Sequence, residues 1–229
     1  NAGIVEQQWI LDIYNLIYAA LLLTGGTLAD ILGRARMFVL GIGLIAAGSI
    51  VCAIAPGTEI LIAGRAVTGL GAALEIPASL AILTVAYPDP HARGRAIGIW
   101  ASCNGIAIGV GPTIGGVLVQ TLGWRSIFYA ALPICAIAML LAWTRVPNSR
   151  DAGERKLDPL GQVLAIVTLG SLAFVAIEGP HRGWTSPLIV APALTMIVTA
   201  LLFVRFERNQ TTALVPFELF ANRAFNAAL

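Results

Sequence analysis

The chain has 229 residues, of which 58% are apolar and only 11% are charged, and its mean hydropathy is +0.84. Soluble domains carry about 25% charged residues. The composition therefore excludes an ordinary soluble domain, and equally a disordered chain. The formal net charge of +2 is too small to suggest a nucleic acid as a partner.

Seven stretches are long and apolar enough to cross a bilayer as helices, which takes about 20 residues. They cover residues 9–28, 37–55, 60–86, 96–119, 127–144, 160–177 and 187–204. An eighth helix is expected to begin near Phe225. The sequence thus predicts an all-α fold, a polytopic bundle of transmembrane helices. Because the chain starts without Met and stops within an apolar run, we expect it to be a fragment of a longer protein.

The lysines and arginines predict the orientation of these spans. Of the 14 Lys and Arg residues, 11 lie in the first, third, fifth and seventh links between spans and two lie in the other links. Positive charge accumulates on the cytoplasmic side, so we expect the arginine-rich links to be cytoplasmic. The chain then begins outside, and a protein that starts in the cytoplasm needs one more helix before Asn1.

Residues for catalysis or metal binding are not evident. Cys52, Cys103 and Cys135 lie in apolar stretches without CxxC spacing, which predicts neither a disulfide framework nor a zinc site. Both histidines lie in links, and no acid–His–nucleophile cluster or phosphate-binding glycine loop is present. We therefore expect no enzyme activity, no metal and no cofactor.

The first link reads GTLADILGRAR from residue 26 to residue 36. Its glycines allow a tight turn, and a simple solvated charged turn is the alternative interpretation. The string resembles the G-x-L-A-D-x-x-G-R-x-R/K loop between the second and third helices of the major facilitator superfamily. In that family the acid braces the cytoplasmic gate through a helix N-terminus and basic partners. The resemblance implies a gating loop formed by Gly26, Asp30, Gly33 and Arg34.

The third span contains two ionisable residues. Arg65 lies six residues past Glu59, roughly 9 Å into the helix, where it needs a partner, a watery cavity or a route to the interface. The segment resembles the fourth-helix motif of the same superfamily, whose arginine is tied to proton coupling, although Thr68 replaces the usual glutamine. Glu75 lies about 15 Å further along. A protonated, packed Glu75 and a proton- or cation-handling Glu75 are both open.

The fourth span reads GIAIGVGPTIGG from residue 105 to residue 116. Small residues at three- or four-residue spacing favour close helix approach, and a proline bends the helix. As a whole, the string resembles the G-x-x-x-G-P-x-x-G-G motif of superfamily antiporters. The implied antiporter motif consists of Gly105, Gly109, Gly111, Pro112, Gly115 and Gly116.

Asp12 lies near the start of the first span, in the string WILDIYN. It could pair with Arg65, bind a proton, face a cationic substrate, or simply be hydrated. The W-x-x-D-x-Y pattern resembles the second helix of quaternary-ammonium and methyl-viologen efflux pumps, which belong to the fourteen-helix drug:proton antiporter branch. Tyr14, Tyr18 and Trp100 are possible substrate-lining residues, with packing as the alternative.

The resemblance also implies a domain organisation. Residues 1–144 correspond to helices 2–6 of the N-terminal six-helix half, and residues 145–159 form a cytoplasmic link. Residues 160–204 form an extra transmembrane hairpin, helices 7 and 8, which twelve-helix members lack. Residues 205–229 form a further cytoplasmic link and the start of helix 9.

The expected function is proton-coupled efflux of lipophilic compounds, with cationic drugs or toxic compounds as the favoured class. The alternative is a proton-coupled exporter of a metabolite, antibiotic or siderophore. The expected partners are the lipid bilayer, the small-molecule substrate and protons, while accessory export partners stay open. The resemblance implies a multi-pass protein of the plasma membrane, the inner membrane of a bacterium.

Overall fold

The computed structural model describes residues 3–150 and 158–208, and all regular structure in these ranges is helical. The helices are α1 (Ile4–Leu32), α2 (Arg34–Ile54), α3 (Thr58–Ala86), α4 (Pro90–Leu122), α5 (Ser126–Arg145), α6 (Pro159–Arg182) and α7 (Pro187–Glu207). Each is long and apolar enough to cross a membrane. The seven predicted spans are therefore confirmed, while the helix expected near Phe225 lies outside the described residues.

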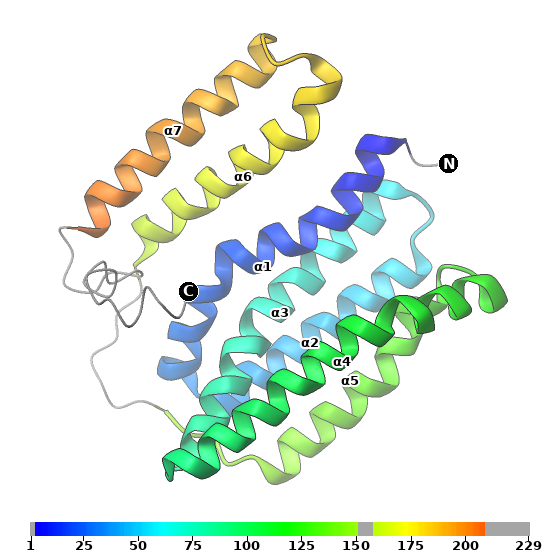
Figure 1. Ribbon diagram of the computed structural model, residues 1–229, viewed down its shortest axis with the longest axis vertical. Coiled ribbons are helices and arrows are strands. Elements are labelled where there is room, and N and C mark those ends of the chain that lie inside the picture. The colour runs from blue at the N-terminus through cyan, green and yellow to red at the C-terminus, as the bar shows by residue number, and fades with distance from the viewer. Residues whose placement is uncertain (1–2, 151–157, 209–229) are drawn as a thin grey trace. The chain divides into compact units, whose positions relative to one another are not determined.

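The chain forms two compact units, Asn1–Gly153 and Glu154–Leu229. The first unit contains α1 to α5, and the second contains α6 and α7. In the first unit, α3 lies between α1 and α2, and α5 runs beside α2 (Figure 1).

Small residues allow α2 and α3 to approach closely. A Cβ on Gly41 would lie 2.7 Å from the Gly71 carbonyl oxygen, and a Cβ on Gly71 would lie 2.6 Å from the Gly41 carbonyl oxygen. Gly48 of α2 and Gly64 of α3 form a second such pair. A Cβ on Gly48 would lie 2.7 Å from the Gly64 carbonyl oxygen, and a Cβ on Gly64 would lie 3.1 Å from the Gly48 carbonyl oxygen. Helices in a bilayer gain stability from such close van der Waals packing, since lipid provides no hydrophobic drive between them.

The contact between α1 and α3 uses a different face of α3. Pro77 carries no N–H, so the carbonyl group of Ala73 has no donor one turn later. This carbonyl lies against Gly25 of α1, where a Cβ would collide with it. Gly69 lies against the carbonyl oxygen of Tyr14, which a Cβ would approach to 2.6 Å. The absence of side chains at Gly25 and Gly69 therefore allows α1 and α3 to pack closely.

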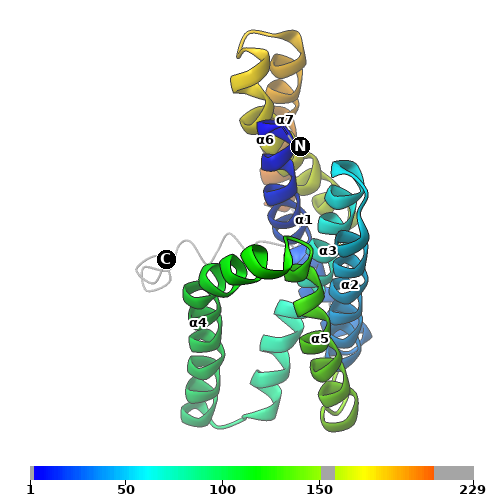
Figure 2. The same ribbon diagram turned by 90° about the vertical axis from the view of Figure 1, so that its right-hand side faces the viewer.

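α4 is the least enclosed helix of the first unit. None of its residues is buried, and its described contacts are with α3 and α5 only. Figure 2 shows α4 standing away from the other helices and bending in its last third, the part that contains Pro112. The predicted bend thus fits the structure, but the predicted close approach at the glycines is not seen. A Cβ on Gly105, Gly109 or Gly116 would meet nothing within 4 Å in the described chain.

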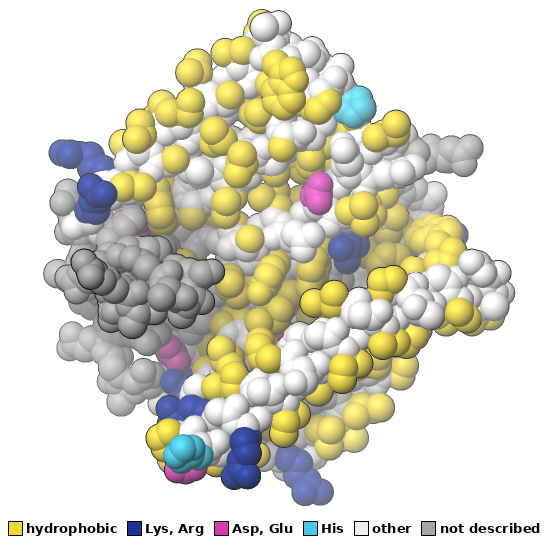
Figure 3. Space-filling view, viewed as in Figure 1, with side chains coloured by type: hydrophobic (Ala, Val, Ile, Leu, Met, Phe, Trp, Pro, Cys, Tyr) yellow, Lys and Arg dark blue, Asp and Glu magenta, His cyan; other side chains and the backbone are white. Residues whose placement is uncertain are grey.

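Apolar side chains cover the lengths of α4 and α5 on the face shown in Figure 3. The Lys, Arg and His side chains of this unit gather mainly at the end where α3 joins α4, where His91 and Arg95 are exposed. An apolar belt with charge at its end is the distribution that a bilayer requires.

In the second unit, α6 and α7 form a helical hairpin. The Thr168 hydroxyl donates to the Thr199 hydroxyl over 2.8 Å, a polar bond between the two helices. α6 is longer than predicted, because the Arg182 Nε donates to Glu178 Oε2 over 2.6 Å and extends the helix beyond the apolar run. The helix ends at Gly183, whose φ of 84° suits a residue without a Cβ.

Candidate functional site in the first helical unit

Arg65 of α3 turns toward α1. Its Nε donates to the Ile10 carbonyl oxygen over 3.1 Å, and its guanidinium carbon lies 4.6 Å from the centroid of the Tyr14 ring. The side chain is half-buried. A guanidinium on an aromatic face is stabilised by the negative charge of the ring's π face. The charge predicted to need a partner therefore finds a ring and a backbone carbonyl.

The ring under Arg65 is part of an aromatic pair. Tyr14 and Tyr18 lie one helical turn apart on α1, with ring centroids 6.3 Å apart and planes inclined by 18°. Both side chains are half-buried. The predicted shared face of the two tyrosines is thus present, and it forms one stacked aromatic surface with a cation at its Tyr14 end.

Asp12 does not pair with Arg65. Its side chain is exposed on α1, and the described residues contain no ion pair between the two. The pairing was one of several possibilities, and it is absent because Arg65 is already held by Ile10 and Tyr14. The proton and substrate roles of Asp12 stay predictions.

Glu75 is half-buried on α3. Its backbone faces Gly41 of α2, so that a Cβ on that glycine would lie 2.8 Å from the Glu75 nitrogen. Glu75 forms no ion pair or hydrogen bond with another side chain in residues 3–150 or 158–208. The role of this acid stays a prediction.

Trp100 joins α4 to α3. Its indole N–H donates to the Ser79 hydroxyl oxygen over 3.2 Å, and that hydroxyl donates to the Ile76 carbonyl oxygen over 2.8 Å. This bond gives Trp100 a bracing role between two helices, while its predicted contact with substrate stays a prediction.

The α1–α2 turn contains the predicted gating loop. Arg34 donates to Asp30 Oδ1 from Nε over 3.1 Å and from Nη2 over 2.8 Å, and the two side chains are only 13% and 9% exposed. Gly33 forms the turn with a φ of 113°, which favours glycine. Gly26 lies on α1 near Pro77 of α3, which a Cβ would meet at 3.6 Å.

A segment that the sequence interpretation missed covers this turn. The Ser149 carbonyl oxygen accepts from the Arg34 N–H over 3.0 Å, and the Asn148 Oδ1 accepts from the Arg36 N–H over 3.4 Å. These are donors in the first turn of α2, which have no partner within the helix. Asn148 was the available signal, since asparagine side chains cap helix N-termini, whereas Ser149 contributes only its backbone carbonyl oxygen.

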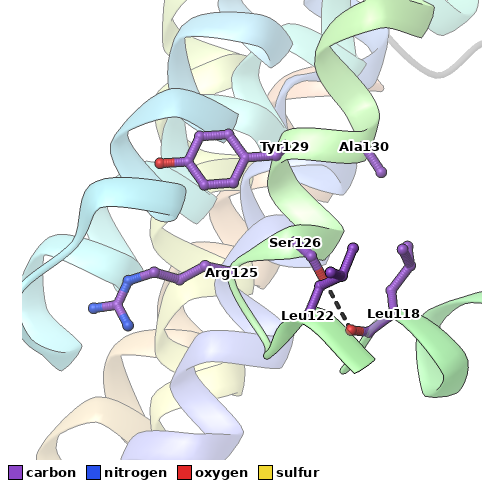
Figure 4. Close-up of a pocket in the computed structure, with 6 residues that line it drawn as sticks. All are labelled: Leu118, Leu122, Arg125, Ser126, Tyr129 and Ala130. Carbon is purple, nitrogen blue, oxygen red and sulfur yellow. Dashed lines mark hydrogen bonds between the residues drawn. The ribbon is translucent and has the colours of Figure 1, made fainter. Parts of the chain in front are cut away.

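A cavity of 610 Å³ lies where α4 meets α5 (Figure 4). Its lining residues are Leu118, Leu122, Arg125, Ser126, Tyr129 and Ala130. Arg125 donates to the Ala55 carbonyl oxygen over 2.8 Å and lies 4.3 Å from the Trp124 ring centroid. Ser126 donates to the Leu118 carbonyl oxygen over 3.1 Å. Arg125 and Ser126 therefore have protein partners and brace the connection between α4 and α5.

The sequence profile of the Major Facilitator Superfamily matches residues 1–221. The chain belongs to the major facilitator superfamily. It is a multi-pass membrane protein of a transporter family, as the seven helices indicate. The motif resemblances on α1, α3 and α4 had predicted this membership.

Three relatives illustrate the similarity. The chain is 39% identical over 222 residues to the multidrug resistance protein Stp of Mycobacterium tuberculosis (strain ATCC 25618 / H37Rv), covering 97% of this chain and 41% of the relative. It is 39% identical to the methylenomycin A resistance protein of Bacillus subtilis (strain 168), covering 96% of this chain and 47% of the relative. It is 34% identical to the multidrug efflux pump LfrA of Mycolicibacterium smegmatis, covering 97% of this chain and 44% of the relative. The chain thus spans less than half the length of these relatives.

Proposed function

We propose that this chain forms part of a secondary transporter that exports lipophilic compounds, cationic drugs above all, in exchange for protons. The observation that carries this proposal is the similarity along nearly the whole chain to proteins named for multidrug resistance and multidrug efflux. The antiporter-like string on α4 supports exchange with protons. The stacked Tyr14–Tyr18 surface supports a cationic substrate, since aromatic faces attract cations.

The acids of the bundle would couple the two flows. Asp12 is exposed on α1 and can be neutralised by a proton or by a cationic substrate. Competition for one carboxylate links proton and substrate movement without contact between them. Glu75 and Arg65 are further coupling residues in this proposal. Each charge that crosses 100 mV changes the free energy by about 2.3 kcal/mol, so the charge exchanged sets the driving force.

The α1–α2 turn would brace the cytoplasmic gate. Transporters of this type alternate access by rocking one half against the other around a central site. A rigid turn serves that motion, and the Asp30–Arg34 pair and the Asn148–Ser149 cover make this turn rigid. In this proposal, a further helix of the full-length protein packs against the glycine face of α4, where the described chain leaves space.

We place the arginine-rich links on the cytoplasmic side of a bacterial inner membrane. Single cysteines in an otherwise cysteine-free full-length protein test this orientation. His91→Cys, in the first turn of α4, should react with an impermeant thiol reagent only from the cytoplasmic side. Gly57→Cys, between α2 and α3, should react only from the opposite side. Reversed labelling would contradict the orientation.

Everted membrane vesicles that contain the full-length protein test the function. The vesicles are energised, quaternary ammonium and dye cations are added one at a time, and the pH gradient is followed. We expect substrate-dependent collapse of the gradient, and loss of this collapse in Asp12→Asn. An unchanged collapse in the variant would remove Asp12 from the site, and no collapse with any cation would contradict cation export.

The second candidate is export of an antibiotic or another metabolite, including a siderophore. The similarity to a methylenomycin A resistance protein favours it. An anionic substrate would use Arg65 as the binding charge in place of Asp12. Affinity for anionic and cationic analogues in Arg65→Gln and Asp12→Asn separates the candidates. Loss of anion binding in Arg65→Gln alone supports the second candidate.

A further inference from the structure

The aromatic surface of α1 already holds a cation. The guanidinium of Arg65 lies 4.6 Å from the Tyr14 centroid, and an arginine side chain stays protonated in proteins. A lipophilic cation that seeks this ring therefore meets a protein charge in the place it would take. The face is either permanently filled by Arg65 or filled only in the absence of substrate.

The way Arg65 is held favours exchange. Within the described ranges its side chain forms one hydrogen bond, from Nε to the Ile10 carbonyl oxygen over 3.1 Å. That carbonyl belongs to a helix, so it keeps a helical donor when the arginine leaves. The terminal nitrogens of Arg65 form no hydrogen bond in the described ranges of the chain. Removing the guanidinium from the ring thus breaks one hydrogen bond and one cation–π contact.

We propose that Arg65 is a resident cation, a side chain that occupies the Tyr14 face until a lipophilic cation displaces it. This inference rests on the proposed function and adds to it a residue that sets the affinity for the substrate. A permanent cation replaces one cation–π contact with another, whereas a neutral compound cannot displace the guanidinium from the ring. Arg65 therefore sets the affinity for cations below that of the bare aromatic pair.

Equilibrium binding to the full-length protein tests the proposal. The probes are tetraphenylphosphonium, a lipophilic cation, and triphenylphosphine oxide, a neutral compound with similar rings. Arg65→Gln keeps a polar side chain and removes the charge. We expect it to tighten tetraphenylphosphonium binding about tenfold, the equivalent of about 1.4 kcal/mol. Binding of the neutral probe should change by less than about twofold.

The tyrosine ring must account for the gain. Tyr14→Leu should weaken cation binding, and the Arg65→Gln/Tyr14→Leu double variant should show no gain over Tyr14→Leu alone. Arg125→Gln is the matched control, because Arg125 also lies on an aromatic ring and donates to a backbone carbonyl oxygen. It should leave both affinities unchanged. Weaker or equal cation binding in a folded Arg65→Gln protein would overturn the proposal.

A second measurement does not depend on the stability of the variants. Phenylglyoxal modifies arginine side chains, and mass spectrometry reports the modified peptide. In the wild-type protein, bound tetraphenylphosphonium should accelerate modification of Arg65 and leave Arg125 unchanged. An equal or slower rate at Arg65 would overturn the displacement. A wild-type protein that binds neither probe would contradict cation export itself, whereas cation binding without these Arg65 effects would contradict only the resident cation.

Discussion

Gly41 tests whether α2 and α3 are held together by the close approach of their backbones. A Cβ at this position would lie 2.7 Å from the Gly71 carbonyl oxygen and 2.8 Å from the Glu75 nitrogen. Both are backbone atoms, so no side-chain rotation relieves the overlap. Overpacking of this kind costs about 1–3 kcal/mol, while alanine gains about 0.5–1 kcal/mol over glycine within a helix. We expect Gly41→Ala to lose about 1–2 kcal/mol of unfolding free energy.

Gly43 of the same helix is the matched control. A Cβ there meets nothing within 4 Å, so Gly43→Ala should be neutral or stabilised by up to about 1 kcal/mol. The unfolding free energy of both full-length variants is measured by denaturation in mixed micelles. The two should differ by about 1–3 kcal/mol. Equal stability of Gly41→Ala and Gly43→Ala would refute the account of how α2 and α3 pack.

Three further substitutions test side-chain contacts within the two units. Asp30→Asn leaves Arg34 in a largely buried place without its counter-charge, and should lose about 1–2 kcal/mol of stability by thermal melting together with most of the transport rate. Trp100→Phe keeps an aromatic ring but loses the bond to Ser79, so stability should fall by about 1 kcal/mol; unchanged cation affinity would identify a brace, and weaker affinity a lining residue. Thr168→Val removes the polar bond of the α6–α7 hairpin and should lose about 0.6 kcal/mol, whereas an unchanged melting temperature would show that this bond adds nothing.

The sequence predicted the helices well and their ends less well. Apolar runs of the required length identify spans directly, because the bilayer dictates both their length and their composition. α6 continues past its apolar run because a local ion pair between Glu178 and Arg182 favours one more turn. A hydropathy profile cannot predict such a polar helix end, because hydropathy measures transfer of a residue to lipid and not its tendency to form a helix.

The partners of the membrane-embedded charge could not be predicted from spacing. Depth along a helix follows from about 1.5 Å per residue, and a pairing of Arg65 with Asp12 was one of the possibilities. The rotation of α3 about its axis relative to α1 decides which α1 residues Arg65 contacts. The close approach of Gly69 to the Tyr14 carbonyl oxygen sets this rotation. Arg65 consequently reaches Tyr14 and Ile10 instead of Asp12.

The glycines of α4 show that a sequence pattern does not identify the helix that packs against it. Their spacing predicted close helix packing, yet they lie open in the described chain, whereas packed glycines occur on α1, α2 and α3. A pattern of small residues indicates that a helix can be approached closely but does not say by which neighbour. The contribution of the α4 motif to transport stays a prediction.

Exchange in proteoliposomes tests the central claim most directly. Purified full-length protein is reconstituted without other proteins, a pH gradient is imposed, and the movements of protons and tetraphenylphosphonium are recorded together. The account predicts that cations accumulate against their gradient while protons leave in the opposite direction, and that Asp12→Asn uncouples the two. Cation movement that does not depend on the pH gradient, or proton flux that is indifferent to the cation, would contradict it.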